Sequence, residues 1–278
     1  KGPSPGYGIS IDLLPIFANI IYMIILKSNA MKEWFNQKNV FFILSMGRSG
    51  TKFLASLIDS ARSIGSIHEF YPDYLFYQAF FRSAKASDYY IKHLRMPYIY
   101  MKNSRRDIDT YGEVNSVLRR NAHSLKKFMP HAKILHLVRN PKDVVRSMMN
   151  RKTMRWYDGV TKFVRPPRGD MYYDKWPEMD RFERICWYWR SENDYIREYA
   201  DRTVKFEDML TDYDYFNNTM SMITGHTIDK AVWMDKVKKP KNVSASYSFP
   251  EYDKWNKAQK DAFSKICSKE MRIYGYEY

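Results

Sequence analysis

Residues 40–58 read VFFILSMGRSGTKFLASLI, and this stretch decides the fold. Its first five residues, 40–44, are a continuous apolar run of strand formers, and residues 52–58 have apolar side chains at helical spacing. Gly47 and Gly50 lie between these two segments. A strand, a glycine-containing loop and a helix in this order direct backbone N–H groups and a helix N-terminus at an anion. The stretch therefore predicts an α/β protein with a phosphate-binding loop.

The rest of the chain continues the alternation of strands and helices. Further strands are predicted at residues 66–70, 134–138 and 203–206, and helices at 74–81, 114–129, from Pro141 onward, 182–199, 207–223 and 252–274. Residues 151–180 are rich in Pro, Gly, Trp and Tyr without periodicity, which indicates an insertion. The pattern predicts a three-layer, P-loop-like α/β fold with a central, mostly parallel sheet flanked by helices. Residues 38–278 are expected to form one domain.

Composition excludes several classes of protein. With 45% hydrophobic and 17% aromatic residues in 278, the chain is too apolar to remain disordered. Cys186 and Cys267 are the only cysteines, so neither a disulfide scaffold nor a zinc knuckle can be built. The formal net charge of +15 predicts an anionic substrate, cofactor or partner.

The N-terminal residues contain the longest apolar run, at positions 13–26. As a helix it would rise about 21 Å, short of the roughly 30 Å hydrocarbon core of a bilayer. We therefore expect residues 1–37 to form an apolar helical segment packed on the domain, with peripheral membrane contact as a further use of it. A cytoplasmic location follows from this interpretation, and a membrane anchor with a Golgi-type lumenal location is the alternative.

The loop at residues 45–52 departs from a Walker A motif. That motif needs four residues between its glycines and a hydroxyl residue after its lysine, whereas here two residues separate the glycines and Phe53 follows Lys52. The strand at 134–138 ends in Arg139, where nucleotide triphosphatases place an Asp that helps to hold Mg²⁺. An arginine there binds a second phosphate directly. The two motifs predict an adenine nucleotide with phosphate at two places, bound without metal.

Together these motifs resemble those of the sulfotransferases that use 3′-phosphoadenosine 5′-phosphosulfate (PAPS). Residues 41–59 are similar to the family's 5′-phosphosulfate loop, and residues 132–152 to its 3′-phosphate motif, in which Arg139 and Ser147 would hold the phosphate. Weaker similarity continues through residues 203–210 and 273–276, with spacing closest to the tyrosylprotein and bacterial carbohydrate types. The resemblance implies PAPS as donor, adenosine 3′,5′-bisphosphate (PAP) as product and no metal. The implied nucleotide-binding residues are Gly47, Arg48, Ser49, Gly50, Thr51, Lys52, Arg139, Ser147, Lys241 and Asn242.

Sulfuryl transfer to a hydroxyl needs a general base near the acceptor proton. Cytosolic family members use a His and tyrosylprotein-type members a Glu, and Glu69 follows Arg48 at a spacing like that of the second group. Glu69 is therefore the expected base, with His68 and Glu113 as alternatives. Arg48 and Lys52 are expected to stabilise the charge on the transferring group.

The acceptor is expected to be a hydroxyl compound of acidic character, a saccharide or a peptide. Residues 139–168 hold nine Lys or Arg against two Asp, interleaved with aromatic side chains. Trp156 and Arg165 are predicted to contact the acceptor, together with Glu113 and Asn115, which occupy the place where many relatives carry a Lys. A solvated basic loop is the alternative for the insertion, and an ordinary polar loop for residues 241–242.

Two other functions are compatible with parts of the sequence. A P-loop kinase would share the fold class but would need ATP and Mg²⁺, for which the motif residues are missing. A non-enzymatic polyanion-binding module would use the charge alone. Nucleic acid is not an expected partner, because no recognised nucleic-acid motif accompanies the basic balance.

Overall fold

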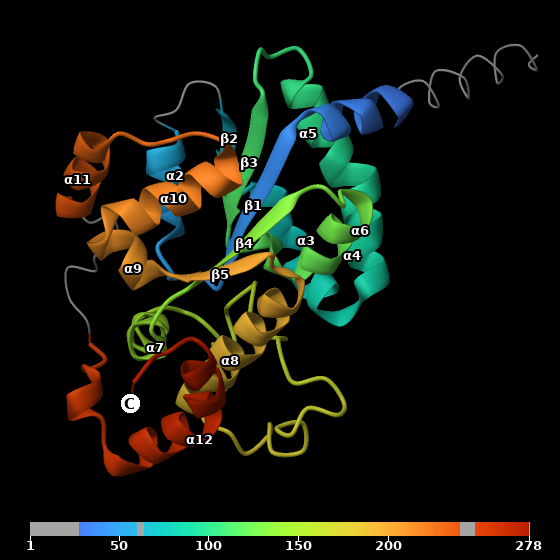
Figure 1. Cartoon of the computed structure of the whole chain (residues 1–278). Coiled ribbons are helices and arrows are strands. Elements are labelled where there is room, and N and C mark those ends of the chain that lie inside the picture. The colour runs from blue at the N-terminus through green and yellow to red at the C-terminus, as the bar shows by residue number, and fades with distance from the viewer. Residues whose placement is uncertain (1–27, 60–63, 240–247, 278) are drawn as a thin grey trace, which may run out of the picture.

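The computed structural model describes residues 28–59, 64–239 and 248–277. At its centre is a five-stranded sheet in the order β2-β3-β1-β4-β5 (Figure 1). The strands are β1 Asn39–Ser45, β2 Ile64–His68, β3 Thr110–Asn115, β4 Lys133–Val138 and β5 Arg202–Lys205. Every strand pairing is parallel, so the predicted α/β fold with a parallel sheet is confirmed.

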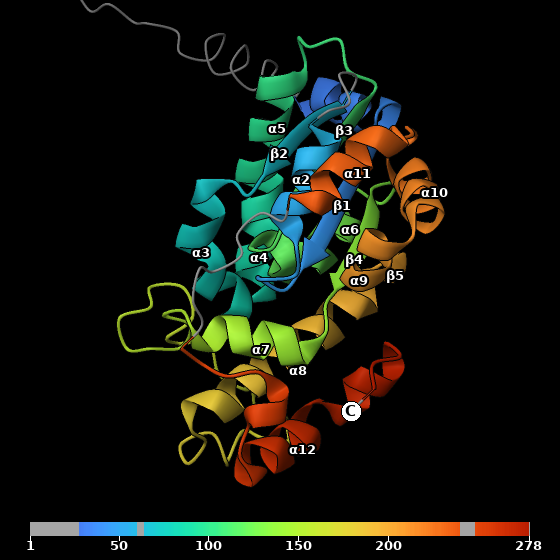
Figure 2. The ribbon, with the colours of Figure 1, turned by 90° about the vertical axis from the view of Figure 1, so that its left-hand side faces the viewer.

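Helices cover both faces of the sheet, as Figure 2 shows with α3 and α5 on one side and α10 and α11 on the other. Alternate residues of β1 supply the two cores: Phe41 and Ile43 pack with α2 and α10, whereas Phe42 and Leu44 pack toward α5 and α6. A strand buried on both faces reads as a continuous apolar run. This is why residues 40–44 were recognisable as a strand in the sequence.

The α-helices have the following bounds: α2 Thr51–Ile58, α3 Tyr71–Arg82, α4 Ala84–Tyr90, α5 Met96–Asn103, α6 Ala122–Phe128, α7 Pro141–Met149, α8 Arg181–Tyr199, α9 Phe206–Thr211, α10 Tyr213–Thr224, α11 Lys230–Lys238 and α12 Lys257–Ile273. A π-helical turn, Ile91–Arg95, joins α4 to α5. A further helix occupies residues 28–37, and it buries Trp34 and Phe35 in the core. No helix in the described part of the chain is long and apolar enough to cross a membrane. Of the predicted N-terminal segment at residues 1–37, positions 1–27, which hold the apolar run, lie outside the described residues.

Three of the predicted helices differ from the observed elements. The helix predicted at residues 114–129 is wrong, because Thr110–Asn115 pairs with β1 and β2 as the central strand β3, and α6 begins only after a 3₁₀ turn at Leu118–Asn121. The helix predicted at 207–223 is two helices, α9 and α10. They are divided at Asp212, which has an extended backbone and whose side chain caps the N-terminus of α10. The predicted C-terminal helix starts later, where Asn256 and Gln259 form a capping box.

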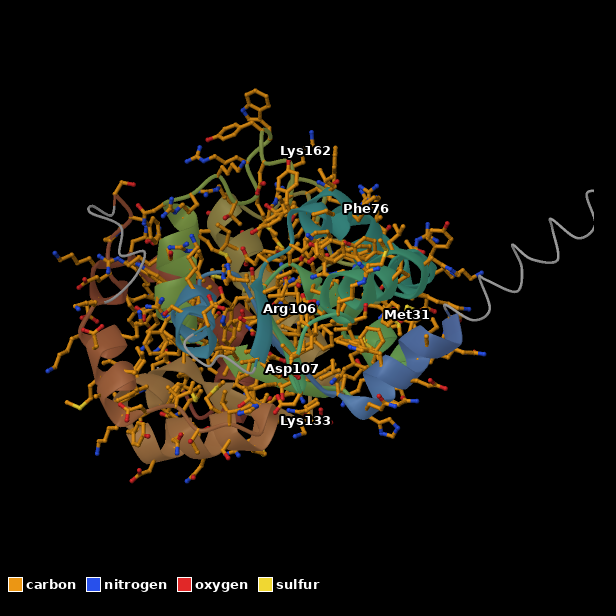
Figure 3. All side chains as sticks on the ribbon, turned by 90° about the horizontal axis from the view of Figure 1, so that it is seen from above. Met31, Phe76, Arg106, Asp107, Lys133 and Lys162 are labelled. Carbon is orange, nitrogen blue, oxygen red and sulfur yellow. The ribbon has the colours of Figure 1, made fainter. Side chains whose placement is uncertain are left out.

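The insertion at residues 151–180 contains no helix or strand. The buried Asp158 organises its first half by accepting hydrogen bonds from the backbone N–H groups of Met154 and Val160 and from the hydroxyl of Thr161. Its second half is tied to α8 through Asp170, which accepts from the indole of Trp187 and pairs with Arg190 at 2.6 Å. Lys162 of the insertion and Phe76 of α3 lie on the same side of the molecule (Figure 3). The insertion is therefore an ordered loop that packs on the domain.

Candidate active site

The carboxyl ends of the strands open into a cavity of about 1150 Å³. Strand β1 is the middle strand of the sheet. From it the strand order runs to β3 and β2 on one side and to β4 and β5 on the other. Ligands of open parallel sheets bind at such a switch point. The cavity lies against the loop after β1, the ends of β2 and β4, helix α7 and the start of the insertion.

The loop between β1 and α2 forms one wall of this cavity. Gly47, Arg48, Gly50, Thr51 and Lys52 all line it. Gly50 is in the left-handed conformation with φ 89°, and a Cβ there would lie 2.0 Å from the ring of Phe206. Only glycine satisfies both conditions, which explains why the loop can turn tightly into α2.

Ser49 is placed differently from its neighbours in the loop. Its side chain is buried and does not line the cavity, and its hydroxyl has no hydrogen-bond partner among the described residues. The structure therefore brings five of the six predicted loop residues to the cavity.

The predicted 3′-phosphate motif lies directly beside the loop. Arg48 donates from Nε to the Oγ of Ser147 at 2.8 Å, and Arg139 donates from Nη1 to the carbonyl oxygen of Arg48 at 3.1 Å. Arg139 also pairs with Asp143 at 3.0 Å. Arg139 lies between β4 and α7, Ser147 lies in the last turn of α7, and both line the same cavity. The two motifs that are 99 residues apart thus form one continuous cationic surface.

Two residues outside the predicted set hold the Arg139 backbone. The indole of Trp189 donates to the carbonyl oxygen of Arg139 at 3.2 Å, and the Glu207 carboxylate accepts from the N–H of Asn140 at 2.9 Å. Glu207 also accepts the hydroxyl of Tyr276 at 2.8 Å. The weak similarity at residues 203–210 and 273–276 was the sequence signal for Glu207 and Tyr276, and none pointed to Trp189.

His68 ends β2 and Glu69 follows it, and both line the cavity beside the start of α2. The Glu69 carboxylate accepts hydrogen bonds from the hydroxyls of Tyr74, at 2.5 Å, and Ser116. The His68 ring lies 3.3 Å from the hydroxyl of Thr51. Burial lowers the pKa of His68 below its ordinary 6.5, although the adjacent Glu69 carboxylate acts in the other direction. His68 is therefore neutral at pH 7.

Glu113 and Asn115 do not line the cavity, although the sequence suggested both as acceptor contacts and Glu113 as an alternative base. Both are fully buried on β3, which is covered on its two faces. The Glu113 carboxylate pairs with Arg95 at 2.6 Å and accepts the hydroxyl of Tyr111 at 2.7 Å. Asn115 accepts the backbone N–H groups of Val117 and Leu118 at 2.9 Å each. These side chains belong to a polar cluster within the core.

The remaining predicted contacts do not line the cavity or fall outside the described residues. Trp156 is 84% exposed, and neither it nor the exposed Arg165 lines the cavity. Their neighbours in the insertion do so: Arg151, Lys152, Arg155 and Tyr157. Lys241 and Asn242 lie outside the described residues.

The cavity is strongly cationic over the described part of the chain. Its lining includes the lysines and arginines Arg48, Lys52, Arg119, Arg139, Arg146, Arg151, Lys152, Arg155 and Lys236. Two carboxylates, those of Glu69 and Asp158, line the cavity with these nine groups in the described residues, and Asp143, Glu192 and Glu251 pair with Arg139, Arg119 and Arg146 from outside the lining. Such a surface binds a ligand with several negative charges.

A family model for the sulfotransferase domain matches residues 38–239. The chain belongs to the sulfotransferase family. This sulfotransferase shares its fold with the solved structure of STF9 from Mycobacterium avium, at a TM-score of 0.50 and 10% identity over 87% of this chain and 78% of that one. Mouse SULT7A1 complexed with PAP matches at a TM-score of 0.49 and 14% identity, covering 84% and 85% of the two chains. The sulfotransferase domain of the curacin biosynthetic pathway matches at 0.49 and 14%, covering 86% and 98%. None of the curated proteins compared with the chain matches it.

Proposed function

We propose that this sulfotransferase moves the sulfuryl group of PAPS to a hydroxyl of an anionic acceptor. The observation that carries the proposal is the hydrogen bond from Arg48 to Ser147, because it joins the glycine loop and the Arg139 motif into one surface. A nucleotide with a 5′-phosphosulfate and a 3′-phosphate presents its two anionic groups at separate places. The loop residues would hold the 5′-phosphosulfate, and Arg139 with Ser147 would hold the 3′-phosphate.

The chemistry assigned to Glu69 follows from its charge and its position. Glu69 accepts the proton of the acceptor hydroxyl, whose oxygen forms a bond to sulfur while the bond from sulfur to the bridging oxygen of the donor breaks. PAP leaves with the electron pair of that bond. Arg48 and Lys52 lie on the loop wall, where they stabilise the negative charge that develops on the sulfuryl and bridging oxygens.

The acceptor is a hydroxyl on an acidic saccharide or an acidic peptide. This part of the proposal rests on the cations that extend beyond the nucleotide motifs into the insertion, at Arg151, Lys152 and Arg155. Arg165 and the exposed Trp156 would extend the contact along the rim. Aromatic faces suit sugar rings or a tyrosine side chain, and arginines suit carboxylates or sulfates on the same molecule.

The experiment combines ligand binding with transfer. Calorimetry should show binding of PAP, and neither ATP with Mg²⁺ nor a generic oligonucleotide should bind comparably. Transfer from ³⁵S-labelled PAPS should then be measured on acidic oligosaccharides, tyrosine-containing acidic peptides and a neutral phenol. Labelling of an acidic acceptor supports the proposal. Equal binding of ATP and PAP, or labelling of the phenol in preference to every acidic acceptor, would overturn the corresponding part of it.

A further inference from the structure

Both oxygens of the Glu69 carboxylate are held by hydroxyl groups from other elements. Tyr74 of α3 donates to Oε2 at 2.5 Å, and Ser116, which follows β3, donates to Oε1. Glu69, Tyr74 and Ser116 all line the cavity. Neither hydroxyl belongs to the loop or to the 3′-phosphate motif.

The Glu69 backbone makes this arrangement unusual. Its φ of 52° lies in the left-handed region, which residues other than glycine seldom occupy. A strained backbone conformation of this kind persists where surrounding contacts hold it in place. Such residues are found most often at functional sites. Arg48 and Met154 are the other non-glycine residues with positive φ in the described ranges. Arg48 lines the same cavity, and Met154 lies between Thr153 and Arg155, which also line it.

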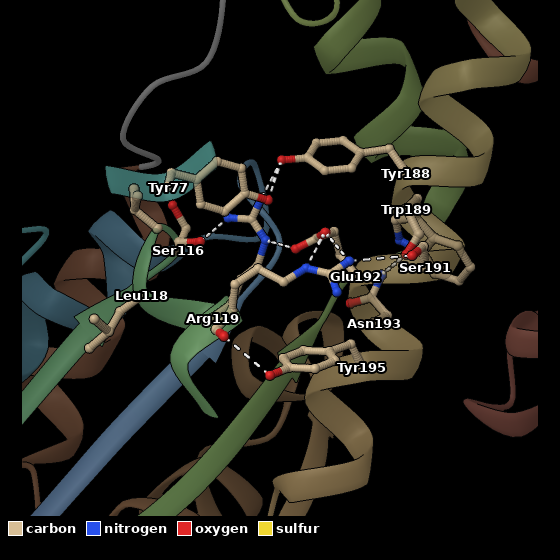
Figure 4. A network of polar contacts seen from close by, with 12 residues as sticks. Tyr77, Ser116, Leu118, Arg119, Tyr188, Trp189, Ser191, Glu192, Asn193 and Tyr195 are labelled. Carbon is tan, nitrogen blue, oxygen red and sulfur yellow. Dashed lines mark hydrogen bonds and ion pairs between the residues drawn. The ribbon is translucent and has the colours of Figure 1, made fainter. Parts of the chain in front are cut away.

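Ser116 is in turn fixed by Arg119. The guanidinium of Arg119 donates to the carbonyl oxygen of Ser116 and to the hydroxyls of Tyr77, at 2.5 Å, and Tyr188 (Figure 4). Arg119 is only 4% exposed, so these contacts are made away from water. Burial would disfavour the charged guanidinium, but the Glu192 carboxylate beside it raises the pKa of Arg119, which therefore remains charged.

Glu192 anchors this network to α8. Its carboxylate pairs with Arg119 and also with Arg120, at 2.5 Å, and it is fully buried (Figure 4). Arg120 stacks on the rings of Phe81 and Tyr195, at 4.1 and 4.6 Å from guanidinium carbon to ring centroid. The donors of an arginine lie in one plane at fixed angles, so a guanidinium that binds several partners at once is held in a single orientation. The segment that carries Ser116 is thereby held in place by α8.

We propose that Ser116 and Tyr74 are positioning residues that hold the Glu69 carboxylate in the orientation for proton transfer, and that Arg119 sets the position of Ser116. The inference rests on the proposed role of Glu69 as the base. Neither hydroxyl takes part in the bond changes at sulfur. Their effect is on the geometry of the base, to which proton transfer is sensitive.

The test is a double-mutant cycle on the full chain. Ser116→Ala and Tyr74→Phe should each lower kcat by about tenfold with an unchanged KM for PAPS, and Ser116→Thr should restore most of kcat because it returns the hydroxyl. In the Glu69→Gln background, measured by single-turnover transfer from ³⁵S-labelled PAPS, neither substitution should lower the rate further. Tyr213→Phe is the matched control, since that hydroxyl donates to the carbonyl of Ile228 on the far side of the sheet.

The outcomes separate this inference from the proposed function. An equal loss from Ser116→Ala and Tyr74→Phe in wild type and in Glu69→Gln would show that the hydroxyls act independently of Glu69, and the inference would be wrong while the base remains assigned. Full kcat in Glu69→Gln alone would instead remove the base assignment and the inference with it. If Ser116→Ala does not fold, Tyr74→Phe carries the same test from a different element.

Discussion

The Nε of Arg48 lies 2.8 Å from the Oγ of Ser147 and donates a hydrogen bond to it, although 99 residues separate the two in sequence. Arg48 has a left-handed backbone with φ 76°, and its carbonyl oxygen accepts from Arg139. The glycine loop therefore takes its shape partly from the second motif. Because the nucleotide would bind to both motifs, loss of one of them should affect the two phosphate positions unequally.

Arg139→Ala should weaken PAP binding by about 1.5–3 kcal/mol and 5′-AMP binding by clearly less, the smaller loss reflecting the hydrogen bond from Arg139 to the Arg48 carbonyl oxygen of the loop. The reason is that the guanidinium would make charge-assisted hydrogen bonds to the 3′-phosphate, which 5′-AMP lacks. Ser147→Ala should give a smaller loss in the same direction. Isothermal calorimetry with both nucleotides measures the difference, and Arg202→Ala on β5 is the control. Equal losses for both ligands would show that Arg139 does not recognise the 3′-phosphate.

Glu69→Gln should lower turnover by roughly 10²–10⁴ and leave nucleotide affinity and the fold intact. The amide keeps the size of the side chain but cannot accept the acceptor's proton. His68→Ala should have a much smaller effect, since the His68 ring contacts the Thr51 hydroxyl at 3.3 Å. Steady-state assays of both variants decide the matter. Normal turnover in Glu69→Gln combined with an inactive His68→Ala would move the role of base to His68.

The parts of the site predicted from sequence are those encoded by short continuous segments. Strand β1 and its loop are recognisable because the apolar run and the glycines adjoin each other, and β4 with Arg139 is recognisable for the same reason. Their meeting follows from the parallel topology, since carboxyl ends of neighbouring strands share one edge. Neither inference needs knowledge of distant contacts.

Strand β3 and the supports of Glu69 could not be predicted in this way. The strand reads TYGEVN, and its polar residues are buried only because Arg95 and Asp73 are brought to them from elsewhere in the chain. Tertiary pairing overrides local propensity here. The contact from Ser116 to Glu69 likewise spans 47 residues and has no motif of its own.

Arg155→Glu should raise the acceptor KM more than Arg165→Glu, because Arg155 lines the cavity and Arg165 lies outside it. Reversal of Arg165 and Arg168 together should still raise KM and flatten its salt dependence, since long-range attraction of an acidic acceptor is screened by salt. The KM for PAPS should be unchanged in the Arg165 and Arg168 variant. Kinetics at several ionic strengths, with Lys269→Glu on α12 as control, provide the measurement. Efficient sulfation of a neutral phenol that is insensitive to salt and to these reversals would contradict the acidic acceptor.

Gly50→Ala should destabilise the protein by more than about 1 kcal/mol and reduce nucleotide affinity. The added Cβ meets both an unfavourable φ of 89° and the Phe206 ring, which also lies beneath the Arg139 guanidinium. Gly159→Ala is the matched control, because a Cβ there has no neighbour within 4 Å. Thermal unfolding with and without PAP measures both effects. Equal stability of the two variants would mean that the loop relaxes without cost.

His136 should make the protein less stable as the pH falls from about 6.5 toward 4. The side chain is fully buried on β4, where its two ring nitrogens lie 3.0 Å from the amide oxygen of Asn193 and 3.2 Å from the hydroxyl of Thr203. Burial lowers the pKa of His136 to about 4. Between pH 6.5 and 4 the unfolded chain therefore binds a proton that the folded chain excludes, and the free energy of unfolding decreases by roughly 3 kcal/mol over that window.

The contribution of His136 has to be measured as a difference, because Asp73 acts in the opposite direction. Burial raises the pKa of Asp73 to about 6, so the folded chain holds a proton that the unfolded chain releases between pH 3.8 and 6, and this favours the folded state as the pH falls. Urea unfolding of wild type and His136→Gln across pH 4–7 cancels the Asp73 contribution. The stability difference between the two should shrink toward low pH, since only the wild type loses free energy of unfolding by keeping a buried imidazole neutral in the folded state. His131→Gln, at an exposed position, should keep the wild-type profile. A stability difference that stays constant from pH 7 to 4 would mean that His136 takes up its proton in the folded state, and that its two polar contacts accommodate the charge.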